Sequence, residues 1–160
     1  MDFFRLATPR DRKYVLIKAD YFGNGDGKCY SNLGMNSVGI NSMSLAPICV
    51  KHHDIVLHEF LHAFGVFHTH QRRDRDDYIN VHWDNIIYKR RRWYQKMKKN
   101  MIDQTIRGVP YDELSLMHYW ANSTYNIDKT KPSLTSKVHI FNSGFSGLGQ
   151  GSEIFGFLMI

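Results

Sequence analysis

The sequence predicts a single α+β domain, and three observations support this fold class. The chain has 160 residues, a length that one domain accounts for. Two apolar runs, Tyr14 to Ala19 and Val38 to Leu45, have the length and composition of strands. The segment Ile55 to Phe64 is apolar on most sides, as expected of a helix that runs through the protein interior.

Turn residues and capping residues mark where these elements end. Gly23 to Gly27 forces a turn after the first strand, and its acids are too few and wrongly spaced for a calcium loop. Pro47 bars extension of the second strand. Asp54 is a suitable N-cap for the helix, and Gly65 supplies its C-terminal stop. Farther along, Ile86 to Met101 places apolar and basic residues on different sides of a predicted amphipathic helix.

Composition excludes several classes of protein. Apolar residues make up 42% of the chain and aromatic residues 14%, far too many for a disordered segment. The longest uninterrupted run of apolar residues and glycine, Ile154 to Ile160, is well short of the roughly 18 residues that span a bilayer. We therefore expect a globular protein with no membrane span. The residues after Met1 do not follow the order of a signal peptide, so we expect any export signal to lie outside this chain.

The positive charge is concentrated in one segment. The chain has 21 basic and 15 acidic residues, and Lys89 to Lys99 contains seven of the basic residues and no acid. Because the remaining charge is nearly balanced, we expect no nucleic-acid partner. For the segment itself, a solvated helix face is favoured, and a contact with a heparin-like polyanion, an acidic substrate or nucleic acid stays open. The polyanion contact would use the cations on one side of the predicted helix, namely Lys89, Arg92, Lys96 and Lys99.

Three polar residues, His58, Glu59 and His62, interrupt the apolar helix. Histidines four positions apart lie on the same helix face and can bind one metal ion. Gly65 can adopt the left-handed backbone that turns the chain and returns His68 as a third ligand. Hydrogen-bonded core histidines are the weaker explanation, because burying several unpaired polar groups costs kcal/mol each. The spacing therefore predicts one zinc ion per chain, bound by His58, His62 and His68.

Further segments extend the pattern on both sides of this motif. His68 to Tyr78 contains Arg-x-Asp-Arg-Asp-x-Tyr directly after the third histidine, and Ser115 to Tyr119 has the sequence Ser-Leu-Met-His-Tyr. Upstream, Cys29 to Gly34 and Ser44 to Cys49 each contribute one cysteine. Together with the zinc motif, these segments resemble the astacin family of metzincin zinc metalloproteases, with Ser-Leu-Met-His-Tyr as the Met-turn. The resemblance extends over about residues 10–150.

The resemblance implies a zincin-like metzincin fold, with an N-terminal mixed sheet, the zinc-binding helix and an irregular C-terminal half that contains the Met-turn. It implies a zinc endopeptidase in which Glu59 is the general base and Tyr119 donates a hydrogen bond to the developing oxyanion. Met117 would form an apolar floor beneath the imidazoles. The resemblance also implies a disulfide between Cys29 and Cys49, whereas the cysteine count alone leaves two buried thiols equally open.

The chain also differs from the family it resembles. Astacins carry a glutamate after the third ligand where this chain has Thr69, and the terminal segments and terminal cysteines of the family have no counterpart here. We therefore expect one astacin-like domain over residues 1–160, with halves of about 1–65 and 66–160, incomplete at both termini. These differences motivate an alternative, an inactive zinc-binding fragment of such a protease.

The resemblance leads to expectations about substrate and location. We expect a polypeptide substrate to lie extended along an edge strand near Ser42 to Leu45. We expect a secreted protein, with the sequon Asn122-Ser123-Thr124 on a surface loop. The charged residues after the third ligand are expected to form structural ion pairs: Arg72, Asp74, Arg75 and Asp76. The remaining histidines are expected on the surface or behind the ligands: His52, His53, His70, His82, His118 and His139.

Overall fold

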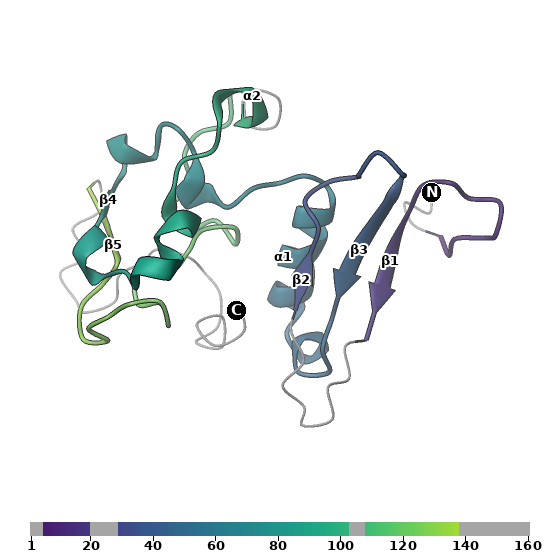
Figure 1. The fold of residues 1–160 in the computed structure, drawn as a ribbon, viewed down its shortest axis with the longest axis horizontal. Coiled ribbons are helices and arrows are strands. Elements are labelled where there is room, and N and C mark those ends of the chain that lie inside the picture. The colour runs from purple at the N-terminus through teal and green to yellow at the C-terminus, as the bar shows by residue number, and fades with distance from the viewer. Residues whose placement is uncertain (1–4, 20–28, 103–107, 138–160) are drawn as a thin grey trace. The chain divides into compact units, whose positions relative to one another are not determined.

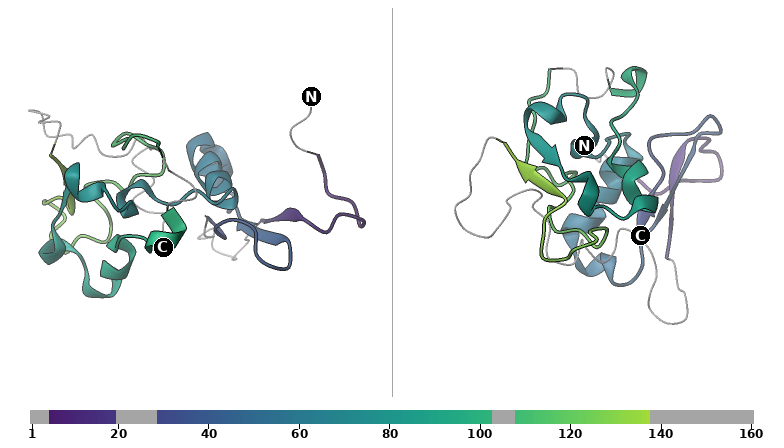
Figure 2. Two further views of the ribbon diagram at one scale, coloured as in Figure 1. Left: turned by 90° about the horizontal axis from the view of Figure 1, so that it is seen from above. Right: turned by 60° about the vertical axis from the view of Figure 1, so that its left-hand side comes forward.

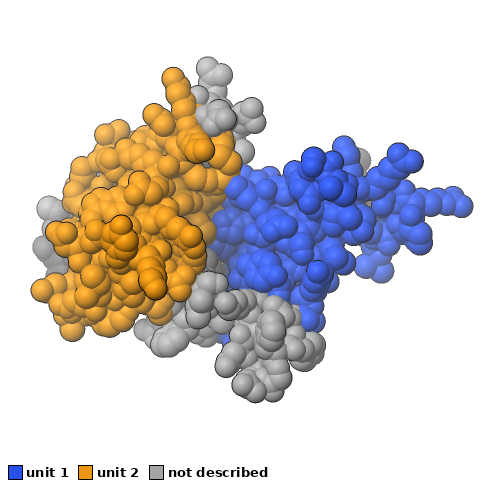
Figure 3. Space-filling model, in the orientation of Figure 1, with its two compact units in different colours: residues 1–66 blue, residues 67–160 orange. Residues whose placement is uncertain are grey.

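The structure is a computed structural model that describes residues 5–19, 29–102 and 108–137 (Figure 1). The chain forms two compact units, Met1–Val66 and Phe67–Ile160, which Figure 3 colours separately. That both units belong to one domain stays a prediction. The predicted turn at Gly23 to Gly27 and the predicted position of His139 lie outside the described residues.

The first unit contains a mixed three-stranded sheet in the order β1-β3-β2. Its strands are β1 (Tyr14–Lys18), β2 (Tyr30–Ser31) and β3 (Ile40–Ser44). β3 is parallel to β1 and antiparallel to β2, so the predicted mixed sheet is confirmed. β3 begins later than the apolar run suggested, because Gly39 has a φ of 86° and extended pairing starts only after it.

The expectation that Ser42 to Leu45 forms a sheet edge is wrong. β3 is the central strand, with Leu16 of β1 as the register partner of Ser42 on one side. On the other side, the backbone N–H of Asn32 donates to the carbonyl oxygen of Ser42 at 2.9 Å. The backbone hydrogen-bonding groups of this segment are therefore used within the sheet, and a substrate cannot add to it there.

Helix α1 (His53–Ala63) lies beside the sheet and contacts β2 and β3 (Figures 1 and 2). The helix starts one residue before the predicted cap, so Asp54 lies in the first turn, where its charge favours the helix dipole. Leu57 and Phe64 are 54% and 57% exposed. The prediction that this helix runs through the interior is thus wrong, because α1 is buried on one side only.

The predicted disulfide joins Cys29 and Cys49. Cys29 directly precedes β2, and Cys49 begins the 3₁₀ helix Cys49–Lys51 that leads into α1. Both cysteines are buried, together with Met43 of β3 and Ile55 of α1. The crosslink therefore fastens the start of the short strand β2 to the segment that precedes the helix.

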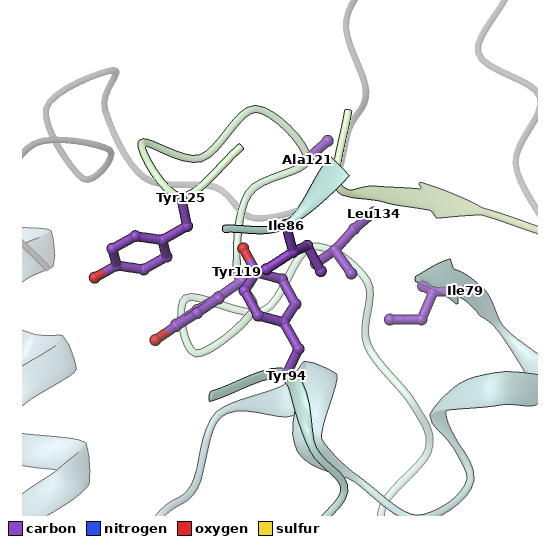
Figure 4. Packing of buried hydrophobic residues seen from close by; sticks show 7 residues of the cluster. All are labelled: Ile79, Ile86, Tyr94, Tyr119, Ala121, Tyr125 and Leu134. Atoms are coloured by element: carbon purple, nitrogen blue, oxygen red, sulfur yellow. The ribbon is translucent and has the colours of Figure 1, made fainter. Parts of the chain in front are cut away.

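The second unit is mostly irregular, as predicted for the C-terminal half. Its sheet has two antiparallel strands, β4 (Ile79–Val81) and β5 (Leu134–Ser136), and its α-helix is α2 (Lys99–Ile102). Short 3₁₀ helices span Thr69–Gln71, Arg75–Asp77, Trp83–Asn85 and Tyr88–Tyr94. A buried cluster holds these segments together (Figure 4), with the members Ile79, Ile86, Tyr94, Tyr119, Ala121, Tyr125 and Leu134.

The predicted amphipathic helix over Ile86 to Met101 does not form. The 3₁₀ helix Tyr88–Tyr94 ends at Gln95, whose backbone is extended (φ −70°, ψ 146°). The backbone N–H of Met97 then donates to the carbonyl oxygen of Gln71 at 2.8 Å. This long-range bond is incompatible with an i to i−4 helical ladder, so helical spacing does not place the basic side chains on one face. Among the described residues, no helix is long and apolar enough to cross a membrane.

Candidate metal centre

Helix α1 presents His58 and His62 on the same face, one turn apart. Their ring centroids are 4.6 Å apart and their planes are nearly perpendicular. His62 donates its Nδ1–H to the carbonyl oxygen of Val66 at 2.8 Å, which assigns the ring proton to Nδ1 and the lone pair to Nε2. Burial lowers the pKa of His62 and favours the neutral imidazole that a metal ion requires.

Gly65 turns the chain from the helix toward the third histidine. Its φ is 90°, and its backbone N–H donates to the carbonyl oxygen of His62 at 2.9 Å. One ligand atom from each of His58, His62 and His68 lies within 4.8 Å of the others. Two nitrogens on one zinc ion are at most about 4.2 Å apart. The three ligand atoms therefore lie close to the separation that a shared ion would set, and a set of three neutral nitrogen donors suits zinc.

Glu59, between the two helical histidines in sequence, is buried with 3% of its surface exposed. Its carboxyl group accepts a hydrogen bond from the backbone N–H of Ser31, and its Oε2 has no hydrogen-bond partner among the described residues. Burial raises the pKa of Glu59 to about 7, and the bond from Ser31 opposes that rise. A buried carboxyl oxygen without a partner is costly unless a ligand or water satisfies it. This orphaned oxygen is the observation that marks α1 as more than a structural helix.

The predicted Met-turn forms a tight turn that leads to Tyr119. The backbone N–H of His118 donates to the carbonyl oxygen of Ser115 at 2.9 Å, and Met117 is buried. The backbone N–H of Thr69, directly after the third histidine, donates to the carbonyl oxygen of Met117 at 2.8 Å. This bond joins two segments that lie almost 50 positions apart in the sequence. As a result, the ring centroids of His68 and Tyr119 are 4.7 Å apart.

Two of the histidines expected on the surface or behind the ligands support this turn. His70 and His118 are 0% and 2% exposed, so neither is a surface residue. His118 donates its Nδ1–H to the carbonyl oxygen of Tyr119 at 2.7 Å and accepts the hydroxyl hydrogen of Tyr111 at 2.8 Å. Burial lowers the pKa of His118 to about 4, consistent with the neutral ring that this pair of bonds requires. Neither residue has the spacing of a metal ligand. The signal in the sequence is that His70 lies two positions after His68 and that His118 directly precedes Tyr119.

The charged run after His68 forms the predicted ion pairs. Arg72 binds Asp74 through Nε and Nη2 at 2.9 and 2.7 Å, and it also donates to the carbonyl oxygens of Val109 and Pro110. Arg75 pairs with Asp76 at 3.0 Å. Both arginines are buried. The run therefore stabilises the segment that carries the third histidine.

The basic segment is divided between structural and exposed side chains. Arg90 packs over the rings of Trp93 and Tyr125 at 4.7 and 5.1 Å, and Lys96 pairs with Asp76 at 2.6 Å. These contacts hold part of the positive charge against the second unit. The predicted polyanion-binding cations are nevertheless exposed, namely Lys89, Arg92, Lys96 and Lys99.

Comparisons with known proteins identify the family of this chain. The model of the Astacin peptidase family matches residues 8–152. The chain is 39% identical to rat meprin A subunit alpha over 146 residues, which is 89% of this chain and 18% of that protein. It is 34% identical to human meprin A subunit beta over 140 residues, or 86% of this chain and 19% of that protein. The chain thus spans about a fifth of the length of these relatives.

A solved structure of a zinc-protease has a fold similar to that of this chain. High choriolytic enzyme 1, a hatching enzyme zinc-protease from medaka fish, superposes with a TM-score of 0.70 and 25% identity. The match covers 95% of this chain and 68% of that one. The predicted metzincin fold class is therefore confirmed. On the family match and the shared zinc-protease fold, this chain belongs to the astacin family of metallopeptidases.

Proposed function

We propose that residues 1–160 form one zinc-dependent endopeptidase domain that hydrolyses peptide bonds in polypeptide substrates. Two observations carry this proposal: the ligand atoms of His58, His62 and His68 converge, and Glu59, which follows His58 in the sequence, has a buried carboxyl oxygen without a partner among the described residues. Zinc bound to three imidazoles lowers the pKa of a coordinated water to about 7 and polarises a carbonyl. The family supports the choice of zinc over other divalent ions.

Glu59 and Tyr119 have different roles in the proposed reaction. Glu59 takes the proton of the attacking water on its carboxylate and later delivers that proton to the leaving amine. The burial of Glu59 and its carboxyl oxygen without a partner among the described residues support this role. Tyr119 donates its phenolic hydrogen in a hydrogen bond to the oxygen that becomes negative as the scissile carbonyl is attacked.

The proposal is tested with Glu59→Gln, which keeps the size of the side chain and one acceptor oxygen but removes the base. We expect cleavage of an unfolded polypeptide to fall by at least about 10³-fold, while bound zinc stays near one per chain. The wild-type protein should lose activity on chelation and regain it when zinc is restored. Turnover that survives in Glu59→Gln would reject the assigned base.

The inactive zinc-binding fragment remains the alternative, motivated by Thr69 at the position of the family glutamate. It predicts folded wild-type protein with one zinc ion and no hydrolysis of any unfolded polypeptide. Metal analysis and a protease assay on the same purified, oxidised sample decide between the two proposals.

We also propose a polyanion contact through the exposed cations of the basic segment, because no acid interrupts Lys89 to Lys99. Replacing Lys89, Arg92, Lys96 and Lys99 by alanine is expected to shorten retention on heparin. Lys13→Ala with Lys51→Ala is the control, since these lysines are exposed and lie far from that segment in the sequence. Equal retention of both variants and the wild type would reject the contact.

We propose an extracellular location, which the disulfide between Cys29 and Cys49 supports. Asn122 of the sequon is exposed, as attachment of a glycan requires. Expression through a eukaryotic secretory pathway should therefore yield a protein whose mass falls after enzymatic removal of N-glycans. Asn122→Gln should show no such mass change. A wild-type protein that emerges without glycan would count against this location.

A further inference from the structure

The ring of Tyr119 is held between other rings of the second unit. Tyr119 is 5% exposed, and its ring lies edge-on to that of Tyr94 with centroids 5.5 Å apart. His70 makes a closer and flatter contact, with centroids 3.9 Å apart and an angle of 27° between the ring planes. Figure 4 shows Tyr119 near the centre of the buried cluster, with Tyr94 and Tyr125 around it. Among the ring contacts of Tyr119, the one with His70 is the closest and the flattest.

His70 is itself fixed from several directions. It is fully buried, and its Nε2–H donates to the carbonyl oxygen of Trp93 at 3.0 Å. Its own carbonyl oxygen accepts a hydrogen bond from Arg75 at 2.9 Å. The preceding residue, Thr69, is bonded to the Met-turn through Met117. A side chain with these anchors cannot move with Tyr119, and it therefore serves as a rigid surface.

We propose that His70 is a positioning residue for the peptidase reaction, whose imidazole face limits the positions open to the Tyr119 ring and so guides the Tyr119 hydroxyl to the oxyanion. This inference rests on the proposed function, in which Tyr119 is the hydrogen-bond donor. His70 touches neither substrate nor metal in this role and acts through the phenol ring alone. The interaction of two stacked aromatic rings is strong enough to shift a conformational equilibrium by roughly 2- to 12-fold. Removing the His70 ring should therefore lower the fraction of molecules in which Tyr119 is correctly oriented.

The decisive experiment is a double-mutant cycle. His70→Ala is expected to lower kcat about 5- to 10-fold and to change KM less than about 2-fold, because the lost orientation matters in the transition state. In a Tyr119→Phe background the same substitution should change kcat less than about 2-fold, since no hydroxyl remains to be oriented. His70→Phe retains a flat ring without the bond to Trp93 and should recover kcat to within about 2-fold of the wild type.

Two controls separate positioning from general destabilisation. Ile79→Ala removes a buried side chain at the edge of the same cluster in Figure 4. Its effect on kcat should be equal in the wild-type and Tyr119→Phe backgrounds. His70→Leu, which fills space without an aromatic face, replaces His70→Ala if that variant does not fold. The proposal is overturned if loss of the His70 ring lowers kcat equally in both backgrounds, or if His70→Phe fails to recover activity.

A spectroscopic measurement makes the inference independent of peptidase activity. With fluorotyrosine at position 119, the ¹⁹F NMR signal should be a single sharp line in the wild type and in His70→Phe. It should become broadened or multiple in His70→Ala. If the wild type cleaves no polypeptide, the proposed function fails, while these spectra still decide whether His70 orients Tyr119. Identical spectra for all three proteins would overturn the positioning role.

Discussion

Replacing Arg75 by methionine tests how the segment after the third histidine is held in place. The guanidinium of Arg75 is buried, with 3% of the residue exposed. It donates from Nη1 to the carbonyl oxygens of His70 and Tyr94, and from Nε to Asp76. Methionine fills a similar volume but donates no hydrogen bond, so both carbonyl oxygens lose this partner inside the protein.

The cost of this substitution follows from the groups left behind. Each buried carbonyl oxygen that loses its donor costs about 1–3 kcal/mol, or about 2–6 kcal/mol for the two. The pair with Asp76 adds little, because the Asp76 side chain is 57% exposed. Part of this cost is offset, because the variant buries an apolar side chain in place of a charged one. We therefore expect Arg75→Met to lower the free energy of unfolding by about 3 kcal/mol.

Urea unfolding followed by circular dichroism measures this difference, with zinc held at a fixed concentration because metal binding shifts apparent stability. A loss of this size lowers the melting temperature of a chain of this length by roughly 6–12 °C. Arg73→Met is the matched control, because Arg73 is exposed and should lose less than about 0.5 kcal/mol. Equal losses at the two arginines would refute the view that buried carbonyl oxygens depend on Arg75.

Three further predictions concern stability. The hydrogen bonds from Arg72 hold the pKa of Asp74 below its usual value, so Asp74→Asn should cost about 1 kcal/mol at pH 7. Because that contribution is lost as pH falls through the lowered pKa, the cost should shrink below about pH 4; a pH-independent difference in urea midpoints would contradict it. Gly39→Ala places a Cβ 2.6 Å from a backbone carbonyl oxygen at a φ of 86°, whereas Gly108→Ala meets nothing within 4 Å at a φ of 79°. Both variants place an alanine on a left-handed backbone, which is unfavourable in each case. The Gly39→Ala variant should nevertheless be less stable than the Gly108→Ala variant by at least about 1 kcal/mol, and equal melting temperatures would contradict the clash. Reducing the disulfide, which closes a sequence separation of 20, should cost about 3 kcal/mol; an unchanged urea midpoint after reduction would count against this.

The metal site shows which features of the structure can be predicted from short stretches of sequence. The positions of His58, His62 and Gly65 are set by helix periodicity and by the backbone freedom of glycine, both of which operate over a few residues. The same local rules predicted the strands around Tyr14 and Ile40, whose bounds moved by only one or two residues. Gly39 explains the later start of the second of these strands.

The wrong predictions share a different cause. The basic segment has helical periodicity, yet the hydrogen bond from Met97 to Gln71 and the packing of Arg90 over Tyr125 favour another conformation. Likewise, no property of Ser42 alone shows whether β3 has a strand on each side. Contacts between residues far apart in the chain decided both cases, and such contacts override local preference.

By itself, the sequence determined the zinc motif, the expected proton-transfer residues, the mixed sheet and the irregular second half, because each depends on short fixed offsets or on motif resemblance. Only the tertiary structure decided that His70 and His118 are buried against Tyr119 and that Glu59 has a carboxyl oxygen without a partner among the described residues. Burial and hydrogen-bond partners are properties of the folded chain, since they depend on which distant segments displace water from a side chain.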